Sequence, residues 1–103
     1  MPQFFYTRGL FYQLALGKYR SRSDIVYQIL LAAKEVDGIT KTRILYKSYL
    51  SYAQLKEYLK LLIDSELLEH IPERSTYRTT AKGVKMMEAY NAMNTLVGSE
   101  VRA

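Results

Sequence analysis

Residues 40–62 read TKTRILYKSYLSYAQLKEYLKLL, and this stretch decides the fold that we predict. Thr40 is a suitable N-cap for a short helix, because its hydroxyl can accept a hydrogen bond from the backbone at the helix start. We expect that helix to break at residues 49–50 and a second helix to begin after Ser51. Gln54 stands three residues after Ser51, so the two predict a capping box, in which each side chain satisfies a backbone N–H.

The second predicted helix is amphipathic. Its apolar side chains recur on one stripe with the spacing of a buried helix face: Leu55, Leu59, Leu62 and Ile63. The polar surface of the two helices carries one acid, Glu57, against five basic residues: Lys41, Arg43, Lys47, Lys56 and Lys60. Two capped helices joined by a tight turn outline a helix-turn-helix, and DNA binding is the first hypothesis that this suggests.

Length and composition exclude several other classes of protein. A chain of 103 residues is expected to form one domain, and 49% apolar residues argue against a disordered chain. The sequence has no cysteine and a single histidine, His70, so disulfides, thiolate sites and a histidine metal cluster are excluded. The apolar runs are shorter than the ~20 residues of a membrane span. We therefore expect a soluble cytoplasmic protein that is not an enzyme, with no catalytic residue, no metal, no cofactor and no evident small-molecule ligand.

The net charge of +5 is unevenly distributed. Residues 1–22 hold four basic side chains and no acid, whereas residues 23–103 hold 11 basic and 10 acidic ones. A nucleic acid would therefore be bound by a local patch, to which the basic entry segment with Arg20 and Arg22 contributes.

Residues 1–17 are predicted to be an N-terminal extension, either disordered or produced by a misassigned start. They are aromatic and apolar without a helical or strand period. If the start is misassigned, Lys18, Arg20 and Arg22 form a short basic arm that lies along DNA phosphates. In the alternative the extension is part of the fold, and its apolar side chains cover the core: Phe4, Phe5, Leu10 and Phe11.

The first helix of the domain is predicted over residues 24–36. Ser23 is its expected cap, and Asp24 is favourable in the first turn. Gly38 is expected to end the helix in the left-handed conformation. The predicted buried face consists of Ile25, Ile29, Ala32, Ala33 and Val36.

A hairpin and a last helix follow the helix-turn-helix. Residues 67–71 and 76–79 are rich in strand formers and flank a turn at residues 72–75. Thr80 is expected to cap a helix that Gly98-Ser99 stops, which leaves residues 98–103 as a tail. Four side chains of this helix follow the 4, 3, 4 spacing of a coiled-coil seam: Met86, Tyr90, Met93 and Val97.

The order helix, helix, helix, hairpin, helix predicts a mainly α fold with a small β-hairpin, which is a winged helix-turn-helix with a C-terminal helix available for dimerisation. The third helix would enter the major groove and the hairpin would be the wing.

Three stretches also carry a family resemblance: KYRSRSDIVYQIL, TKTRILYKSYLSYAQLKEYLKLLIDSELLE and YRTTAKGVKMMEAY. They resemble the small archaeal winged-helix proteins that are predicted transcriptional regulators. More distantly, they are similar to the archaeal ten-kilodalton winged-helix chromatin proteins. The resemblance spans about residues 18–96, within a predicted domain of 18–97, and its most specific pieces include T-x-K-G. It implies a DNA-binding fold, often dimeric through the last helix, with no cofactor.

The residues that match the family's helix-turn-helix are Lys41, Arg43, Tyr46, Lys47, Ser51, Tyr52, Gln54, Lys56 and Lys60. The final helix is shorter than in the chromatin-type relatives, and residues 1–16 match nothing in the family.

The predicted DNA contacts divide by role. Phosphate contacts are assigned to Lys41, Arg43, Lys47, Lys56, Lys60 and the wing residues Arg74 and Arg78. Sequence choice is assigned to the start of the Ser51 helix, where Gln54 could read the edge of an adenine. Tyr49 and Tyr52 are predicted to contact the backbone through their hydroxyls. The alternative for these polar residues is a solvated helix face and a hairpin tip that is charged for solubility.

The remaining unusual residues have structural interpretations. Ten tyrosines suggest a stacking surface for single strands, but four of them lie beside apolar positions and are predicted at the rim of the core: Tyr27, Tyr46, Tyr58 and Tyr77. His70 is predicted to be a structural or surface residue. Met86, Met87 and Met93 are predicted to be packing residues.

Two functional hypotheses follow. The first is a double-stranded DNA-binding protein, either a transcription regulator or a minor chromatin protein of the nucleoid, acting as a homodimer through the seam of the last helix. Its two recognition helices would meet a two-fold site with half-sites about 10 base pairs apart. The second is a winged helix that acts as a protein-interaction module without binding DNA, which the near-neutral charge of residues 23–103 favours. For the seam, the alternative is that it packs entirely on the protein's own first helix.

Overall fold

The computed structural model describes residues 20–102, and the side chains of residues 20–96. The predicted extension, Lys18 and the side chain of Val97 lie outside this range. Within it the chain forms α2 (Arg22–Ala32), β1 (Ile39–Thr40), α3 (Lys41–Ser48), α4 (Tyr52–Asp64), β2 (Leu68–Ile71), β3 (Thr76–Thr79) and α5 (Ala81–Arg102). The predicted mainly α architecture with a hairpin is confirmed. No helix of this part of the chain is long and apolar enough to cross a membrane.

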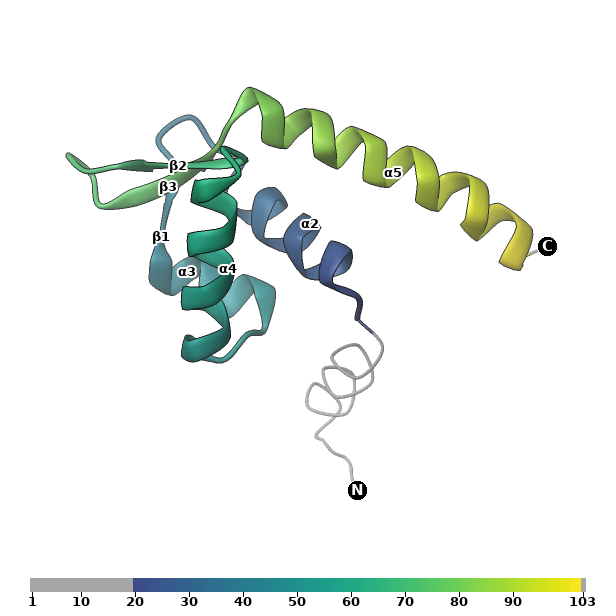
Figure 1. Cartoon of the computed structure of the whole chain (residues 1–103), viewed down its shortest axis with the longest axis horizontal. Coiled ribbons are helices and arrows are strands. Elements are labelled where there is room, and N and C mark those ends of the chain that lie inside the picture. Colours follow the sequence, from purple (N-terminus) through teal and green to yellow (C-terminus); the bar gives the residue numbers. More distant parts are fainter. Residues whose placement is uncertain (1–19, 103) are drawn as a thin grey trace, which may run out of the picture.

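The hairpin gains a third strand that the sequence pattern does not reveal. β1 pairs antiparallel with β3, with Ile39 opposite Tyr77, so the sheet has the order β1-β3-β2. This strand precedes α3 directly. It has only two residues, which is too few for an alternating hydrophobic pattern to be recognised in the sequence. In Figure 1 the β2–β3 hairpin extends to one side of the helices, and α5 runs from the sheet toward the other side.

The helix-turn-helix forms as predicted because its caps are local. The hydroxyl of Thr40 accepts from Arg43 N, which begins α3, and Ser51 and Gln54 form the capping box of α4. Between the helices Tyr49 is in the left-handed conformation, with φ 57°, and this residue ends α3. Three of the four predicted stripe residues of α4 are buried and Ile63 is half-buried. The buried three pack in the core with residues from α2, α3 and β2: Leu55, Leu59 and Leu62 with Ile29, Leu30, Ile44 and Leu68.

The start of α2 differs from the prediction. Ser21, and not Ser23, is the N-cap, because Asp24 is three residues after Ser21 and completes a capping box with it. The Asp24 carboxylate accepts from Ser21 N at 3.0 Å, and the Ser21 hydroxyl accepts from Asp24 N at 3.1 Å. Ser23 cannot form the same reciprocal pair.

The end of α2 also differs from the prediction, because β3 forms hydrogen bonds with the last carbonyls of the helix. Thr79 N donates to the carbonyl of Ala33, and the Thr79 hydroxyl donates to the carbonyl of Leu30. The helix therefore ends at Ala32, and Val36 is 84% exposed instead of buried. Gly38 does adopt a positive φ of 75°, but it serves the approach to β3: a Cβ there would lie 2.6 Å from the carbonyl oxygen of Tyr77.

The T-x-K-G sequence at residues 80–83 holds α5 against the connection between α4 and β2. Thr80 accepts from Gly83 N, which confirms the predicted cap, and its hydroxyl also donates to the carbonyl of Glu66. The Lys82 ammonium donates to the carbonyl of Ser65 at 2.8 Å, so it neutralises the C-terminal end of α4. Gly83 is buried where a Cβ would lie 2.4 Å from the carbonyl oxygen of Leu67.

The predicted stop at Gly98-Ser99 is wrong, because α5 continues to Arg102. Glycine lowers helix stability by about 1 kcal/mol relative to alanine, but it ends a helix only where the chain can turn into a competing cap. The sequence after Ser99 offers no such turn.

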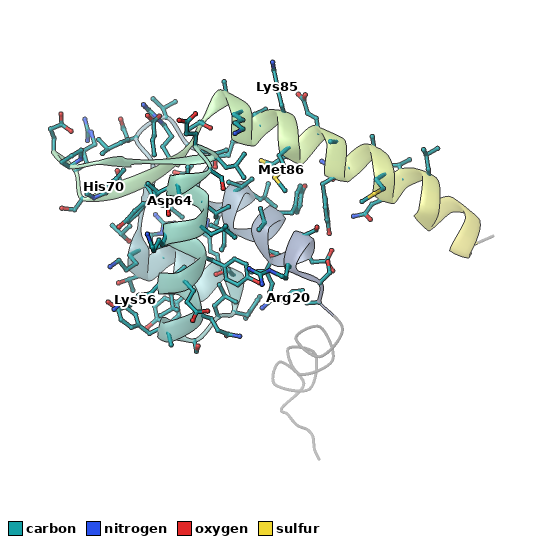
Figure 2. The ribbon with its side chains drawn as sticks, in the orientation of Figure 1. Arg20, Lys56, Asp64, His70, Lys85 and Met86 are labelled. Atoms are coloured by element: carbon teal, nitrogen blue, oxygen red, sulfur yellow. The ribbon has the colours of Figure 1, made fainter. Side chains whose placement is uncertain are left out.

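The predicted seam of α5 divides into two parts. Tyr90 stacks on Tyr27 of α2 with ring centroids 4.4 Å apart, and the Tyr90 hydroxyl donates to the Asp24 carboxylate. Figure 2 shows Met86 pointing from α5 toward α2, whereas Lys85 points away from it. This first part packs on the chain's own first helix, as the alternative interpretation held. Met93 lies farther along and is 55% exposed.

The hydrogen bond from Tyr90 gives a pH-dependent prediction. It is the main cause that lowers the pKa of Asp24, followed by the bond from Ser21 N. A carboxyl group whose pKa is lowered by folding contributes stability above its unfolded pKa and loses that contribution as pH falls through the folded value. Replacing Tyr90 with phenylalanine is therefore expected to cost about 1 kcal/mol at neutral pH.

Urea unfolding at pH 7 and at pH 3 checks this expectation. The difference between the wild type and Tyr90→Phe should shrink as the pH falls toward the lowered pKa of Asp24. Tyr46→Phe, which removes a hydroxyl from a ring that is 73% exposed, is the matched control and should leave stability unchanged. The same loss for Tyr90→Phe at both pH values would show that the bond to the carboxylate does not cause it.

Candidate nucleic-acid interface

The positive charge of the described chain is concentrated in the helix-turn-helix. Residues 38–56, which we call the acid-free segment, contain four basic side chains and no acid: Lys41, Arg43, Lys47 and Lys56. Residues 20–37 hold three basic and three acidic side chains, and residues 57–102 hold six basic and seven acidic ones. A local positive surface therefore lies over α3, the turn and the first turn of α4.

The cations of the acid-free segment keep their charge available. All the ion pairs found among the described side chains lie outside it and join Lys60 to Asp64, Arg74 to Asp37 and Arg78 to Glu69. Arg43, Lys47 and Lys56 are exposed, and Figure 2 shows Lys56 on the outer side of α4. Lys41 is half-buried, with its ammonium 5.7 Å from the centre of the Tyr52 ring. An anionic backbone meets these four charges without first displacing an acid.

Beyond its first turn the outer face of α4 is close to neutral. The Lys60 ammonium lies 3.1 Å from the Asp64 carboxylate one turn later, and both side chains are exposed. Glu57 is also exposed and follows Lys56 directly. An exposed pair of this kind contributes at most about 1 kcal/mol, so Lys60 can exchange Asp64 for a phosphate, but it adds little net potential.

Three tyrosines of the acid-free segment are exposed. Tyr49 and Tyr52 lie at the turn and at the first residue of α4, where the backbone contacts were predicted, and they are 52% and 57% exposed. The prediction that Tyr46 lies at the rim of the core is wrong, since it is 73% exposed. Ile44 is fully buried, and a residue two positions farther along a helix lies about 200° around the axis, on the opposite face.

The side chains of Ser51 and Gln54 are already occupied by the capping box. Gln54 Oε1 accepts from Ser51 N at 3.1 Å. A bidentate contact with adenine requires the amide oxygen and the amide nitrogen together. The predicted base contact by Gln54 therefore competes with the cap of α4, and the exposed Tyr52 and Lys56 are better placed to meet a ligand at this end of the helix.

Arg20 and Arg22 do not form a free arm. The Arg20 guanidinium donates to the carbonyl of Ser48 at 2.7 Å and to that of Tyr49 at 3.3 Å. Arg20 therefore neutralises the C-terminal end of α3 and holds the backbone of the turn through these two carbonyls. Arg22 lies over the ring of Tyr58, 5.6 Å from its centre. Both residues join α2 to the helix-turn-helix, and their predicted contacts with phosphates stay predictions.

Both wing arginines form ion pairs within the protein, which the sequence does not reveal. Arg78 pairs with Glu69 at 2.8 Å and donates to the carbonyl of Val36 at 2.7 Å, so it joins the sheet to the loop before β1. Arg74, at the tip of the hairpin, lies 3.6 Å from Asp37 in an exposed pair that a phosphate can replace. Arg74 is therefore the better candidate for a contact between the wing and DNA.

His70 lies on β2 beside an aromatic side chain of the sheet. Its ring lies 4.8 Å from that of Tyr77 on the adjacent strand. Within the described residues, no group of three or more histidine, cysteine, aspartate or glutamate side chains could hold a metal ion.

The arrangement of capped helices, turn and wing agrees with a comparison of the sequence with known families. A family model described as winged helix-turn-helix matches residues 19–97, which is most of the chain. The chain belongs to the winged helix-turn-helix family. A comparison with curated proteins finds no match. Winged helix-turn-helix domains are generally DNA-binding modules and typically not enzymes, which agrees in kind with the predicted function.

Proposed function

We propose that this winged helix-turn-helix protein binds double-stranded DNA through α3, the start of α4 and the tip of the wing. The observation that carries the proposal is the acid-free segment, whose four cations lie on the helix-turn-helix and form no ion pair with any described acid. Phosphate contacts by lysine and arginine supply most of the affinity of such proteins for DNA.

The residues divide into positioning contacts and base contacts. Lys41, Arg43 and Lys47 of α3 hold phosphates on one side of the major groove, and Arg74 reaches the backbone from the wing. Lys56 and the exposed Tyr52 lie at the N-terminal end of α4, the end from which a recognition helix meets base edges. The outer face of α4 beyond this end adds little net charge. Contacts by α4 therefore contribute more to discrimination between DNA sequences than to affinity.

The biological role that we propose is transcription regulation or minor chromatin packaging in the nucleoid of an archaeal cell. The resemblance of three stretches of the chain to archaeal winged-helix regulators supports this role. The sign of regulation and the target sequence depend on base contacts, which selection of bound sequences from random duplexes would identify.

A direct titration tests DNA binding. We expect a fluorescently labelled duplex of about 20 base pairs and arbitrary sequence to bind with a dissociation constant near or below 10⁻⁶ M at ~50 mM salt, as nonspecific binding by such surfaces does. Anisotropy measures the complex. No binding at this salt concentration would contradict the proposal.

We also propose that the protein is a homodimer through the C-terminal half of α5. Met93 and Leu96 are 55% and 73% exposed. Figure 1 shows no other described element beside the C-terminal half of α5. Pairing with a second copy would bury these apolar side chains and present two recognition helices to a two-fold site. Sedimentation at micromolar concentration tests the proposal: a dimer mass that Met93→Glu converts to a monomer is expected. A monomer mass for the wild type would contradict it.

A further inference from the structure

Three exposed tyrosine rings distinguish the turn of the helix-turn-helix from the rest of the molecule. The described residues contain seven tyrosines, of which only Tyr46, Tyr49 and Tyr52 are more than half exposed. They follow one another at intervals of three residues, so successive Cα atoms are at most about 11 Å apart. The other four are half-buried against their own chain: Tyr27, Tyr58, Tyr77 and Tyr90. The exposed aromatic surface thus coincides with the acid-free segment.

Duplex DNA offers few base faces on which exposed tyrosine rings could stack. In B-form DNA the bases are stacked on one another and offer only their edges in the grooves. A tyrosine therefore reaches a duplex mainly through its hydroxyl, by a hydrogen bond to the backbone. Unpaired bases, in contrast, expose their faces, and aromatic side chains that line a positive surface bind them by stacking.

The cations beside the rings fit the same ligand. The Lys41 ammonium lies 5.7 Å from the centre of the Tyr52 ring, so a positive charge and an aromatic face stand next to each other. Arg43 and Lys47 are exposed on the same short helix as Tyr46. A strand that stacks its bases on the rings can therefore place its phosphates on the neighbouring cations. The near-neutral outer face of α4 beyond Lys56 limits this surface to a few nucleotides.

We propose that the turn of the helix-turn-helix binds single-stranded DNA, with Tyr46 and Tyr52 stacking on unpaired bases and with Lys41, Arg43 and Lys47 holding the phosphates. This site rests on the proposed function, because single strands would bind the same basic surface as duplex DNA. It extends the ligands of that surface from paired to unpaired DNA. Tyr49 stands midway between these two residues in the sequence, and the Arg20 guanidinium donates to its carbonyl oxygen.

Substitutions that separate the ring from the hydroxyl test the proposal. The probes are a short labelled oligo(dT), which has no duplex structure, and a labelled duplex of about 20 base pairs, compared at the same salt concentration. The double variant Tyr46→Leu/Tyr52→Leu removes both rings and is expected to weaken binding of oligo(dT) roughly tenfold or more. The leucine variant and Tyr46→Phe/Tyr52→Phe both lack the hydroxyl groups that contact a duplex, so these two variants should bind the duplex within about threefold of each other. Tyr46→Phe/Tyr52→Phe keeps both rings and should retain binding of oligo(dT) within about threefold.

The outcomes distinguish this inference from the proposed function. Unchanged binding of oligo(dT) by the leucine variant, or a loss relative to the phenylalanine variant that is equal for both probes, overturns it. Duplex binding by the wild type without binding of oligo(dT) overturns the inference alone, whereas failure to bind either probe overturns the proposed function as well. Thermal melting followed by circular dichroism verifies folding. If the double variant melts early, the single substitution Tyr46→Leu, at the most exposed of the three rings, replaces it with the same expectations.

Discussion

Reversing two charges of α3, in Arg43→Glu/Lys47→Glu, is expected to weaken duplex binding about 30-fold to 1,000-fold at ~50 mM salt. Both side chains are exposed and have no ion pair with a described acid, so each can meet a phosphate directly. Each substitution removes an attraction and adds a repulsion, for which about 1–2 kcal/mol is a reasonable estimate near a protein surface. Two such changes sum to about 2–4 kcal/mol, which raises the dissociation constant about 30-fold to 1,000-fold. Anisotropy titration of the same labelled duplex measures the effect.

A matched control separates a local contact from a change of net charge. Lys85→Glu/Lys34→Glu alters the net charge by the same amount at exposed positions outside the acid-free segment, and Figure 2 shows Lys85 on the outer side of α5. This variant is expected to weaken binding less than about tenfold, through long-range electrostatics alone. Equal losses for the two variants would place the DNA elsewhere than on α3.

Adding one methyl group at Gly83 is expected to have the largest effect on stability. Alanine has the higher helix propensity by about 1 kcal/mol, so an ordinary position in α5 would gain stability from Gly→Ala. At Gly83, however, the new Cβ would lie 2.4 Å from the carbonyl oxygen of Leu67 and 2.6 Å from Cγ2 of Thr79. Relief requires α5 to move away from the connection between α4 and β2, and the net cost is expected to be about 2–3 kcal/mol. For a domain of this size that is a fall in melting temperature of roughly 10–20 °C.

Thermal melting of Gly83→Ala and of a control, Ala89→Gly, checks this expectation. Ala89 is an exposed position of the same helix, so the control is expected to cost only the propensity difference of about 1 kcal/mol. A Gly83→Ala variant as stable as the wild type would mean that α5 does not pack on the carbonyl of Leu67 as described.

The parts of the fold that the sequence predicts correctly are those determined over a few residues. The caps at Thr40, Ser51 and Thr80 each depend on a hydroxyl and a backbone N–H three residues later, and all three are present. The buried stripe of α4 follows from helical spacing in the same way. The order of the elements, which also follows from caps and spacings, agrees with the winged helix-turn-helix match.

The parts that the sequence does not predict depend on contacts between distant residues. α2 ends early because Thr79, far along the chain, takes its last carbonyls, and β1 exists because β3 passes beside it. In the candidate site, the engagement of Arg20 with the end of α3 and of Arg78 with Glu69 depends on the assembled fold. The exposure of Tyr46 could have been predicted, since helical spacing from Ile44 already places it on the outer face. The site residues themselves stay predictions until binding is measured.

The salt dependence of duplex binding tests the central proposal most directly. If the three cations of α3 and Arg74 of the wing each neutralise one phosphate, a plot of log K against log salt concentration should fall with a slope of about −3 to −4. Removing two of them in Arg43→Ala/Lys47→Ala should reduce the magnitude of that slope by about 2. Binding whose affinity does not change with salt, or a slope that is the same in the wild type and this variant, would contradict a DNA interface on the acid-free segment.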